Sequence, residues 1–174
     1  MSAGDISNAA YDRIGGVFQR ALTGLTIEQL KTQPSGPESN PIGWLAWHLS
    51  RTQDKNYSQL LGEEELWVTD GWCERFGMPA DRGTGNGDSL EQVRAFDPID
   101  SDTLIAYFEA ARNKSRRFLD ALTDDDLEKP SAAGISRDET VKISIARVTG
   151  DLIQHTGQIA YVRGLVDRHG WYGA

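Results

Sequence analysis

A long apolar stripe near the end of the chain constrains the fold more than any other feature of the sequence. In residues 138–168 apolar side chains recur at intervals of four and three, at Val141, Ile145, Val148, Leu152, Ile159, Val162 and Val166. This spacing is typical of a helix that packs nearly parallel or antiparallel to its neighbours in a bundle. His155 occupies one position of the stripe, and Asp151 lies one turn before it. A helix that is otherwise built for burial therefore carries a polar pair.

Three further segments with helical periodicity predict a four-helix bundle. They span residues 5–22, 40–62 and 101–121. In the second segment Asn40 and Pro41 suit the N-cap and the first helical position, and Gly62 suits the residue after the last turn. No segment alternates polar and apolar residues as a strand does. We expect one all-α domain over residues 1–174, a four-helix bundle with long crossover connections.

The connections between the predicted helices contain short helical signals. LTIEQLKTQP (residues 25–34) and LTDDDLEKP (residues 122–130) each indicate a capped turn, although recurring cap chemistry explains their similarity equally well. Residues 62–98 are rich in glycine and contain one short helix candidate at residues 89–96. Because Trp67 and Trp72 argue against disorder, we expect this long segment to pack over one end of the bundle.

Charge and composition exclude several classes of partner. The formal net charge of −8 argues against nucleic acid and against anionic membranes, which both require basic surfaces. Cys73 is the single cysteine, which favours a reducing compartment. The first residues lack the pattern of a signal peptide, and no run of apolar residues is long enough to span a bilayer. We expect a cytoplasmic protein that acts on small molecules, and a homodimer remains open.

The histidines provide the candidate chemistry. Asp151 and His155 lie at positions i and i+4 of one helix, so both side chains can reach a single metal ion. His48, on the flank of another helix, is the histidine placed to supply a third ligand, whereas His169 lies near the C-terminus and is expected to be solvated. Two histidines and one carboxylate suit a catalytic zinc site and also non-haem iron. The alternative is a salt bridge along the helix, which is the commoner meaning of Asp-x-x-x-His.

Two motifs resemble the DinB/YfiT-like superfamily. They are PIGWLAWHLSRTQD (residues 41–54) and DLIQHTGQIAYVRGL (residues 151–165), with the GW-containing glycine-rich segment between them. The nearest resemblance is to the actinobacterial branch that includes mycothiol-dependent maleylpyruvate isomerase and related thiol transferases. It implies a four-helix bundle with a divalent metal, often zinc or nickel, held by His48, Asp151 and His155. Many members have histidine where this chain has Asp151, and the isomerase branch is similar to this chain in having an acidic residue there.

Four other residues are weighed for roles near the metal. Gln158 corresponds to a family position and is expected to contact a ligand or a metal-bound water; otherwise it is a polar residue facing the third long helix. Arg51 is a candidate for binding an anionic substrate, with a surface ion pair to Asp54 as the alternative. Trp72 is a candidate for a lid over the ligand, with packing of the loop as the alternative. Cys73 has no neighbouring histidine in sequence, which argues against a nucleophile.

These observations together lead to three functional hypotheses. The first is a metal-dependent enzyme, with zinc the first choice and nickel or iron also possible, that uses a low-molecular-weight thiol of the mycothiol type. It transfers the thiol to a small electrophile or isomerises that substrate. The second is a non-catalytic metal-binding or stress-related bundle protein. The third is a metal-assisted hydrolase with the same ligands and no thiol.

Overall fold

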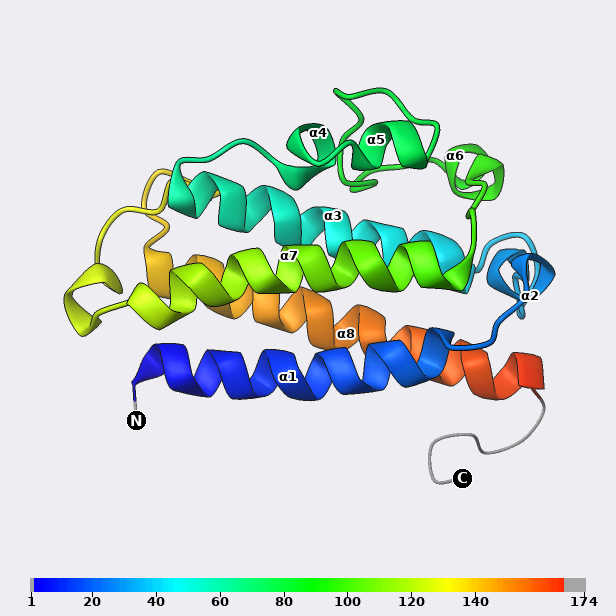
Figure 1. Ribbon diagram of the computed structural model, residues 1–174, viewed down its shortest axis with the longest axis horizontal. Coiled ribbons are helices and arrows are strands. Elements are labelled where there is room, and N and C mark those ends of the chain that lie inside the picture. Colours follow the sequence, from blue (N-terminus) through cyan, green and yellow to red (C-terminus); the bar gives the residue numbers. More distant parts are fainter. Residues whose placement is uncertain (1, 168–174) are drawn as a thin grey trace.

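The computed structural model describes residues 2–167 and shows the bundle that the periodicity predicts (Figure 1). Its four long helices are α1 (Ala3–Leu22), α3 (Ile42–Leu61), α7 (Ser101–Ala121) and α8 (Val141–Asp167). Helices α1 and α3 each pack against both α7 and α8. Over the described residues there is no strand, and no helix is long and apolar enough to cross a membrane. The all-α prediction is confirmed.

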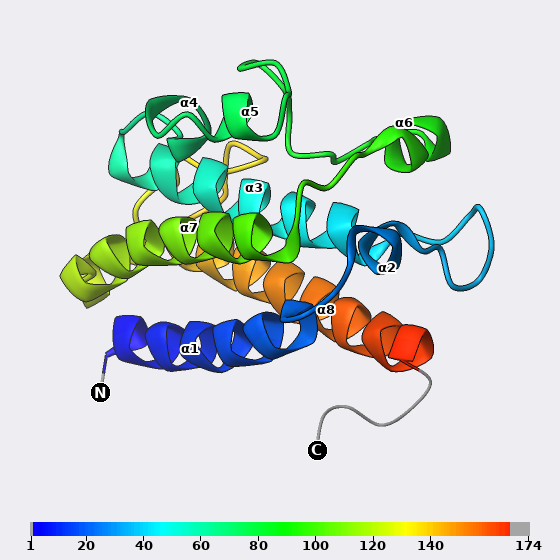
Figure 2. The same cartoon turned by 45° about the vertical axis from the view of Figure 1, so that its right-hand side comes forward.

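The direction of the helices explains the longest connection. Figure 1 shows α3 and α7 running the same way, opposite to α1 and α8. The chain between α3 and α7 must therefore return along the length of the bundle. This crossover contains α4 (Leu66–Thr69), α5 (Trp72–Arg75) and α6 (Leu90–Ala95), and both views show it along the outer side of α3 (Figure 2). The expectation that residues 62–98 cover one end of the bundle is wrong, because a crossover between parallel helices has to span its side.

The helix boundaries follow the capping signals closely. The N-cap of α3 is Pro41 rather than the expected Asn40, a shift of one residue, and Gly62 ends the helix in the left-handed conformation with φ of 68°. The two short connecting turns are α2 (Ile27–Lys31) and a 3₁₀ turn (Asp124–Asp126). Thr26 and Thr123 begin them with the predicted capping boxes.

Buried groups fix the crossover to α3. Trp67 is fully buried, and its ring centroid lies 6.3 Å from that of Trp47. Asp54 on α3 is also fully buried, and its carboxylate accepts hydrogen bonds from the backbone N–H groups of Leu66 and Trp67, each at 2.9 Å. The hydroxyl of Tyr107 on α7 donates to the same carboxylate at 2.9 Å. One side chain thus ties the first turn of α4 to two helices of the bundle.

Candidate metal centre

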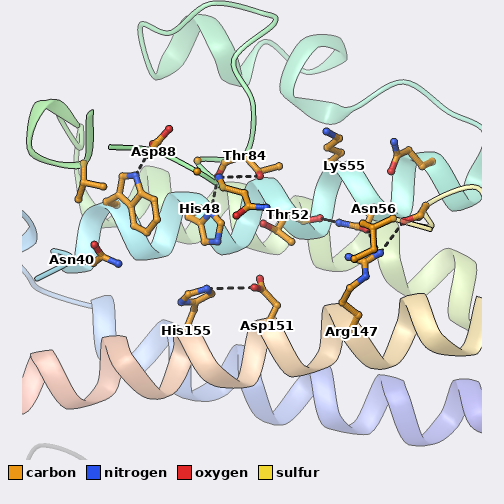
Figure 3. Close-up of a pocket in the computed structure, with 18 of the residues that line it drawn as sticks. Asn40, His48, Thr52, Lys55, Asn56, Thr84, Asp88, Arg147, Asp151 and His155 are labelled. Atoms are coloured by element: carbon orange, nitrogen blue, oxygen red, sulfur yellow. Dashed lines mark hydrogen bonds and ion pairs between the residues drawn. The ribbon is translucent and has the colours of Figure 1, made fainter. Parts of the chain in front are cut away.

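The three predicted ligands converge between α3 and α8. Figure 3 shows His48 extending from α3 toward α8, and Asp151 and His155 extending from α8 toward α3. One ligand atom from each residue can be chosen so that all three lie within 4.8 Å of one another. The spacing i, i+4 places Asp151 and His155 on one face of α8, and the packing of α3 on α8 brings His48 to that face.

His48 is oriented by the crossover. Its Nδ1 lies 2.6 Å from the backbone carbonyl oxygen of Thr84. Because a carbonyl oxygen only accepts, Nδ1 carries the proton of the neutral ring, and Nε2 is left free to coordinate a cation. The ring of Trp44 stacks on His48 with centroids 4.8 Å apart. Burial lowers the pKa of His48 below its usual value of 6.5, which favours the neutral form that binds metal.

His155 is held by two residues of its own helix. Its Nδ1 lies 2.7 Å from Oε1 of Gln158, and its Nε2 lies 3.4 Å from Oδ1 of Asp151. The interaction with Asp151 is the main reason why the pKa of His155 is raised above its usual value of 6.5. The salt bridge along the helix, which was the alternative to a metal site, is therefore present.

That salt bridge does not satisfy the whole site. Oδ2 of Asp151 is buried and has no hydrogen-bond partner within residues 2–167. A buried acceptor without a donor costs about 1–3 kcal/mol, more when it is charged, and a cation among the three residues would remove that cost. Two imidazole nitrogens and a carboxylate oxygen are also donors that zinc accepts, with a position left open for a ligand. The residues present fit a divalent cation.

The three residues lie in the wall of a cleft of about 650 Å³. Helices α3 and α8 form two of its sides, residues 84–88 of the crossover form a third, and residues 133–135 before α8 close one end. A volume of this size is typical of sites for small molecules. Polar side chains dominate the lining beyond the histidines, including Asn40, Thr52, Lys55, Asn56 and Arg147 (Figure 3).

Glycine allows the crossover to approach this site. Gly85 has φ of +91°, and a Cβ atom built on it would lie 2.8 Å from Cζ3 of Trp47. Beside it, the carboxylate of Asp88 accepts a hydrogen bond from Nε1 of Trp44 at 3.1 Å and pairs with Arg82 at 2.5 Å. These contacts hold the Thr84 carbonyl against His48, so the glycine-rich segment is a wall of the site.

The structure brings some of the other candidates to the site and not others. Gln158 contacts His155 directly. Arg51 is only 2% exposed and does not line the cleft, because its guanidinium pairs with Glu65 at 2.6 Å and lies 3.6 Å from Asp54. Substrate binding by Arg51 is not supported, and the alternative ion pair with Asp54 exists in buried form. Trp72 also lies away from the cleft and packs on Tyr107, with ring centroids 5.0 Å apart.

Three further positions complete the comparison with the sequence. Cys73 is buried in α5 and does not line the cleft. Gly157 on α8 is exposed, and a Cβ there would meet no atom within 4 Å, so this glycine does not serve close helix packing. His169 lies outside the described residues.

Sequence reasoning missed several residues that line the cleft. Lys55 follows His48 by seven residues, and Arg147 precedes Asp151 by four, so helical periodicity alone places each on the face of a predicted ligand. Both were detectable by extending the faces of His48 and Asp151. The Thr84 carbonyl was not, because a backbone acceptor in an irregular segment has no sequence signature.

Comparisons with known proteins agree with this architecture. The family model described as the DinB superfamily matches residues 10–159. A solved structure titled as a conserved protein from Enterococcus faecalis is similar in fold, with a TM-score of 0.86 and 24% sequence identity, and the match covers 97% of this chain and 99% of that one. No curated protein matches the chain. Because the family model spans most of the 174 residues, the chain belongs to the DinB superfamily.

Proposed function

We propose that this protein is a metal-dependent enzyme that joins a low-molecular-weight thiol to a small electrophile, or isomerises that electrophile through the thiol. The observation that carries the proposal is the convergence of His48, Asp151 and His155 in the wall of a cleft. An isolated structural metal site would need no cleft beside it. The resemblance to the mycothiol-dependent isomerase branch, with its acidic residue at position 151, favours mycothiol as the thiol.

The residues around the cleft would have distinct roles in this reaction. His48, Asp151 and His155 would hold a divalent cation, with zinc the first choice. When bound, such a cation lowers the pKa of a coordinated thiol toward neutrality. Thr84 and Gln158 keep the two imidazoles in the orientation and tautomer that coordination requires. The cleft provides room for a small electrophile next to these residues.

The position of Cys73 supports an external thiol. It is the only cysteine in the sequence, it is 7% exposed, and it is absent from the lining of the cleft. A nucleophilic sulfur at this site therefore has to come from a bound small molecule. This separates the proposal from an enzyme with a catalytic cysteine.

Metal analysis and a thiol-dependent assay test the proposal together. Protein purified without added metal should contain close to one equivalent of zinc, nickel or iron. It should also accelerate the loss of monochlorobimane, a thiol-reactive electrophile, in the presence of mycothiol. Asp151→Asn should lose most of the metal and the activity. Asp102→Asn, at an exposed position of α7, is the matched control and should lose neither.

The results also distinguish the other hypotheses. Protein with metal that hydrolyses ester substrates, and shows no thiol-dependent activity, would instead be a metal-assisted hydrolase. Folded protein that binds no metal on titration with zinc, nickel or iron would exclude both enzymes and favour a stress-related bundle protein.

A further inference from the structure

The cleft contains basic groups although the chain as a whole is acidic. The formal net charge of the chain is −8, yet Lys55 and Arg147 both line the cleft. The two acidic residues of the lining are already engaged, since Asp88 pairs with Arg82 and Asp151 belongs to the metal centre. Arg147 is itself paired with Glu139 at 3.0 Å, so the unpaired charge available to a ligand beyond the metal centre is that of Lys55, and Arg147 contributes hydrogen-bond donors.

Arg147 is held in place from behind. Its Nε and Nη2 lie 3.1 and 3.0 Å from Oε1 of Glu139, and Nη2 also donates to the carbonyl oxygen of Ala133 at 2.8 Å and to Oδ1 of Asn56 at 3.2 Å. Glu139 is 5% exposed and is itself fixed by Ser144 at 2.5 Å. No partner for Nη1 of Arg147 occurs in the part of the chain that the structure describes. The guanidinium is thus oriented with one nitrogen still available.

Lys55 supplies a second, uncommitted charge at the rim. Within the described residues its ammonium makes neither a hydrogen bond nor an ion pair, and the side chain is partly buried. It follows His48 by two helical turns, so the two residues share one side of α3. A lysine without a partner beside a cleft can approach an anion that enters it.

The distance from the metal centre defines the length of a ligand that reaches both. Arg147 lies one turn before Asp151 on α8, an axial rise of about 6 Å. Figure 3 shows Arg147 extending from α8 to Asn56 of α3, at the end of the cleft that lies beyond Thr52 as seen from His48. A molecule whose donor atom meets the three metal-binding residues therefore passes Thr52 and Asn56 before it reaches Arg147.

We propose that Arg147 and Lys55 form a carboxylate-binding subsite, and that the adduct of thiol and electrophile carries a carboxylate, supplied by the electrophile, several bonds away from the sulfur that meets the metal centre. Arg147 would hold the carboxylate through Nη1. Figure 3 shows Lys55 extending from α3 away from α8, so its side chain would turn toward the cleft to reach the same carboxylate. The role that the sequence suggested for Arg51 is thereby assigned to two other basic residues. The carboxylate-binding subsite does not depend on the proposed metal-dependent function. The expectation that the same ligand also meets the metal centre rests on that function.

Two matched thiols test the subsite in zinc-loaded protein. Isothermal titration calorimetry compares 6-mercaptohexanoate with 6-mercaptohexan-1-ol, which differ only in the terminal carboxylate. We expect the carboxylate to bind at least tenfold more tightly. Lys55→Met and Arg147→Gln should each reduce that ratio at least threefold. Lys142→Met, an exposed lysine on the same helix as Arg147 that pairs with Glu128, should leave it unchanged. Arg147→Lys keeps the charge and serves if Arg147→Gln does not fold.

A second measurement works without metal. In metal-free protein, hexanoate should shift the NMR signals of the Arg147 Nε–H group and of the amides of residues 133–135, and hexan-1-ol should not. Equal affinity for the two thiols, with no shifts from hexanoate, would overturn the subsite and leave the metal-dependent function standing. A carboxylate preference that survives in both Lys55→Met and Arg147→Gln would also overturn it. If zinc-loaded protein binds neither thiol while hexanoate still shifts Arg147, the subsite stands and the proposed function fails.

Discussion

The pKa values of the two candidate histidine ligands, His48 and His155, are shifted in opposite directions. Burial lowers the pKa of His48, whereas the interaction with Asp151 raises the pKa of His155. A metal ligand must be the neutral imidazole, so the proton on His155 competes with the cation over a range that extends above its usual pKa of 6.5. His48 presents no such competition near neutral pH. The two histidines therefore contribute unequally to the pH dependence of the site.

The first prediction is that zinc affinity rises with pH through the pKa of His155. Below that pKa, release of one proton per ion should change the affinity by about tenfold per pH unit, and the gain should level off once His155 is neutral. Competition titrations with a chromophoric chelator between pH 6 and 8 measure this dependence. A zinc affinity that is constant across the interval would show that His155 is not a ligand.

The second prediction concerns the residue that orients His155. Gln158→Leu removes the acceptor of Nδ1 while keeping a side chain of similar size at an exposed position. Loss of such a partner costs roughly 10–100-fold in metal affinity, and we expect the zinc dissociation constant to rise by at least tenfold. Gln154→Leu, also exposed on α8, is the control and should bind zinc like the wild type. If the two variants bind zinc equally, Gln158 does not orient the ligand.

At the scale of the elements, helical periodicity predicted which faces of the long helices carry the candidate ligands, but it did not predict the path of the crossover. The face of α3 that carries His48 and the face of α8 that carries Asp151 follow from residue spacing, because a helix repeats its geometry. Arg51 was considered from its closeness to His48 in sequence, yet it points to the crossover and is buried there. The path of residues 62–100 depends on contacts with distant residues such as Asp54, which no local pattern encodes.

The third prediction tests the crossover as a wall of the site. Gly85→Ala places a methyl group against Trp47 in a backbone conformation that favours glycine, at a cost of about 1–3 kcal/mol. Because the adjacent Thr84 carbonyl orients His48, the variant should also bind zinc more weakly. Thermal unfolding and zinc titration measure the two effects. Gly83→Ala is the matched control, since a Cβ there meets no atom within 4 Å. Equal zinc affinity in both variants would mean that the crossover around Gly85 does not hold His48 in position for zinc.

At the scale of the whole molecule, the parallel arrangement of α3 and α7 makes the site depend on a long segment that lies outside the four-helix core. The bundle supplies all three ligands from α3 and α8, but the crossover orients His48 and closes the cleft. Its attachment to the bundle rests on buried groups, above all on the carboxylate of Asp54. Stability and metal binding should therefore be coupled through a residue that touches no metal ligand.

Asp54→Ala is the test of that coupling. The substitution leaves the buried cations of Arg51 and Lys114, which lie 3.6 and 3.9 Å from the carboxylate, without this counter-charge, and it frees the first turn of α4. Breaking a buried network of this kind costs about 3–5 kcal/mol, which lowers the melting temperature of a chain of this size by roughly 6–20 °C. Calorimetry measures the loss, with Asp102→Ala as an exposed control.

Zinc titration of the same variant, at a temperature where it is folded, then separates two outcomes. Weaker zinc binding than in the control would show that anchoring the crossover supports His48 from a distance, since Asp54 makes no contact with the three ligands. Unchanged zinc binding in a destabilised variant would show that residues 84–88 keep their position independently of α4. The contacts of Gly85 and Asp88 with the tryptophans of α3 would then be enough to hold them. A melting temperature equal to that of the control would remove Asp54 as the anchor of the crossover.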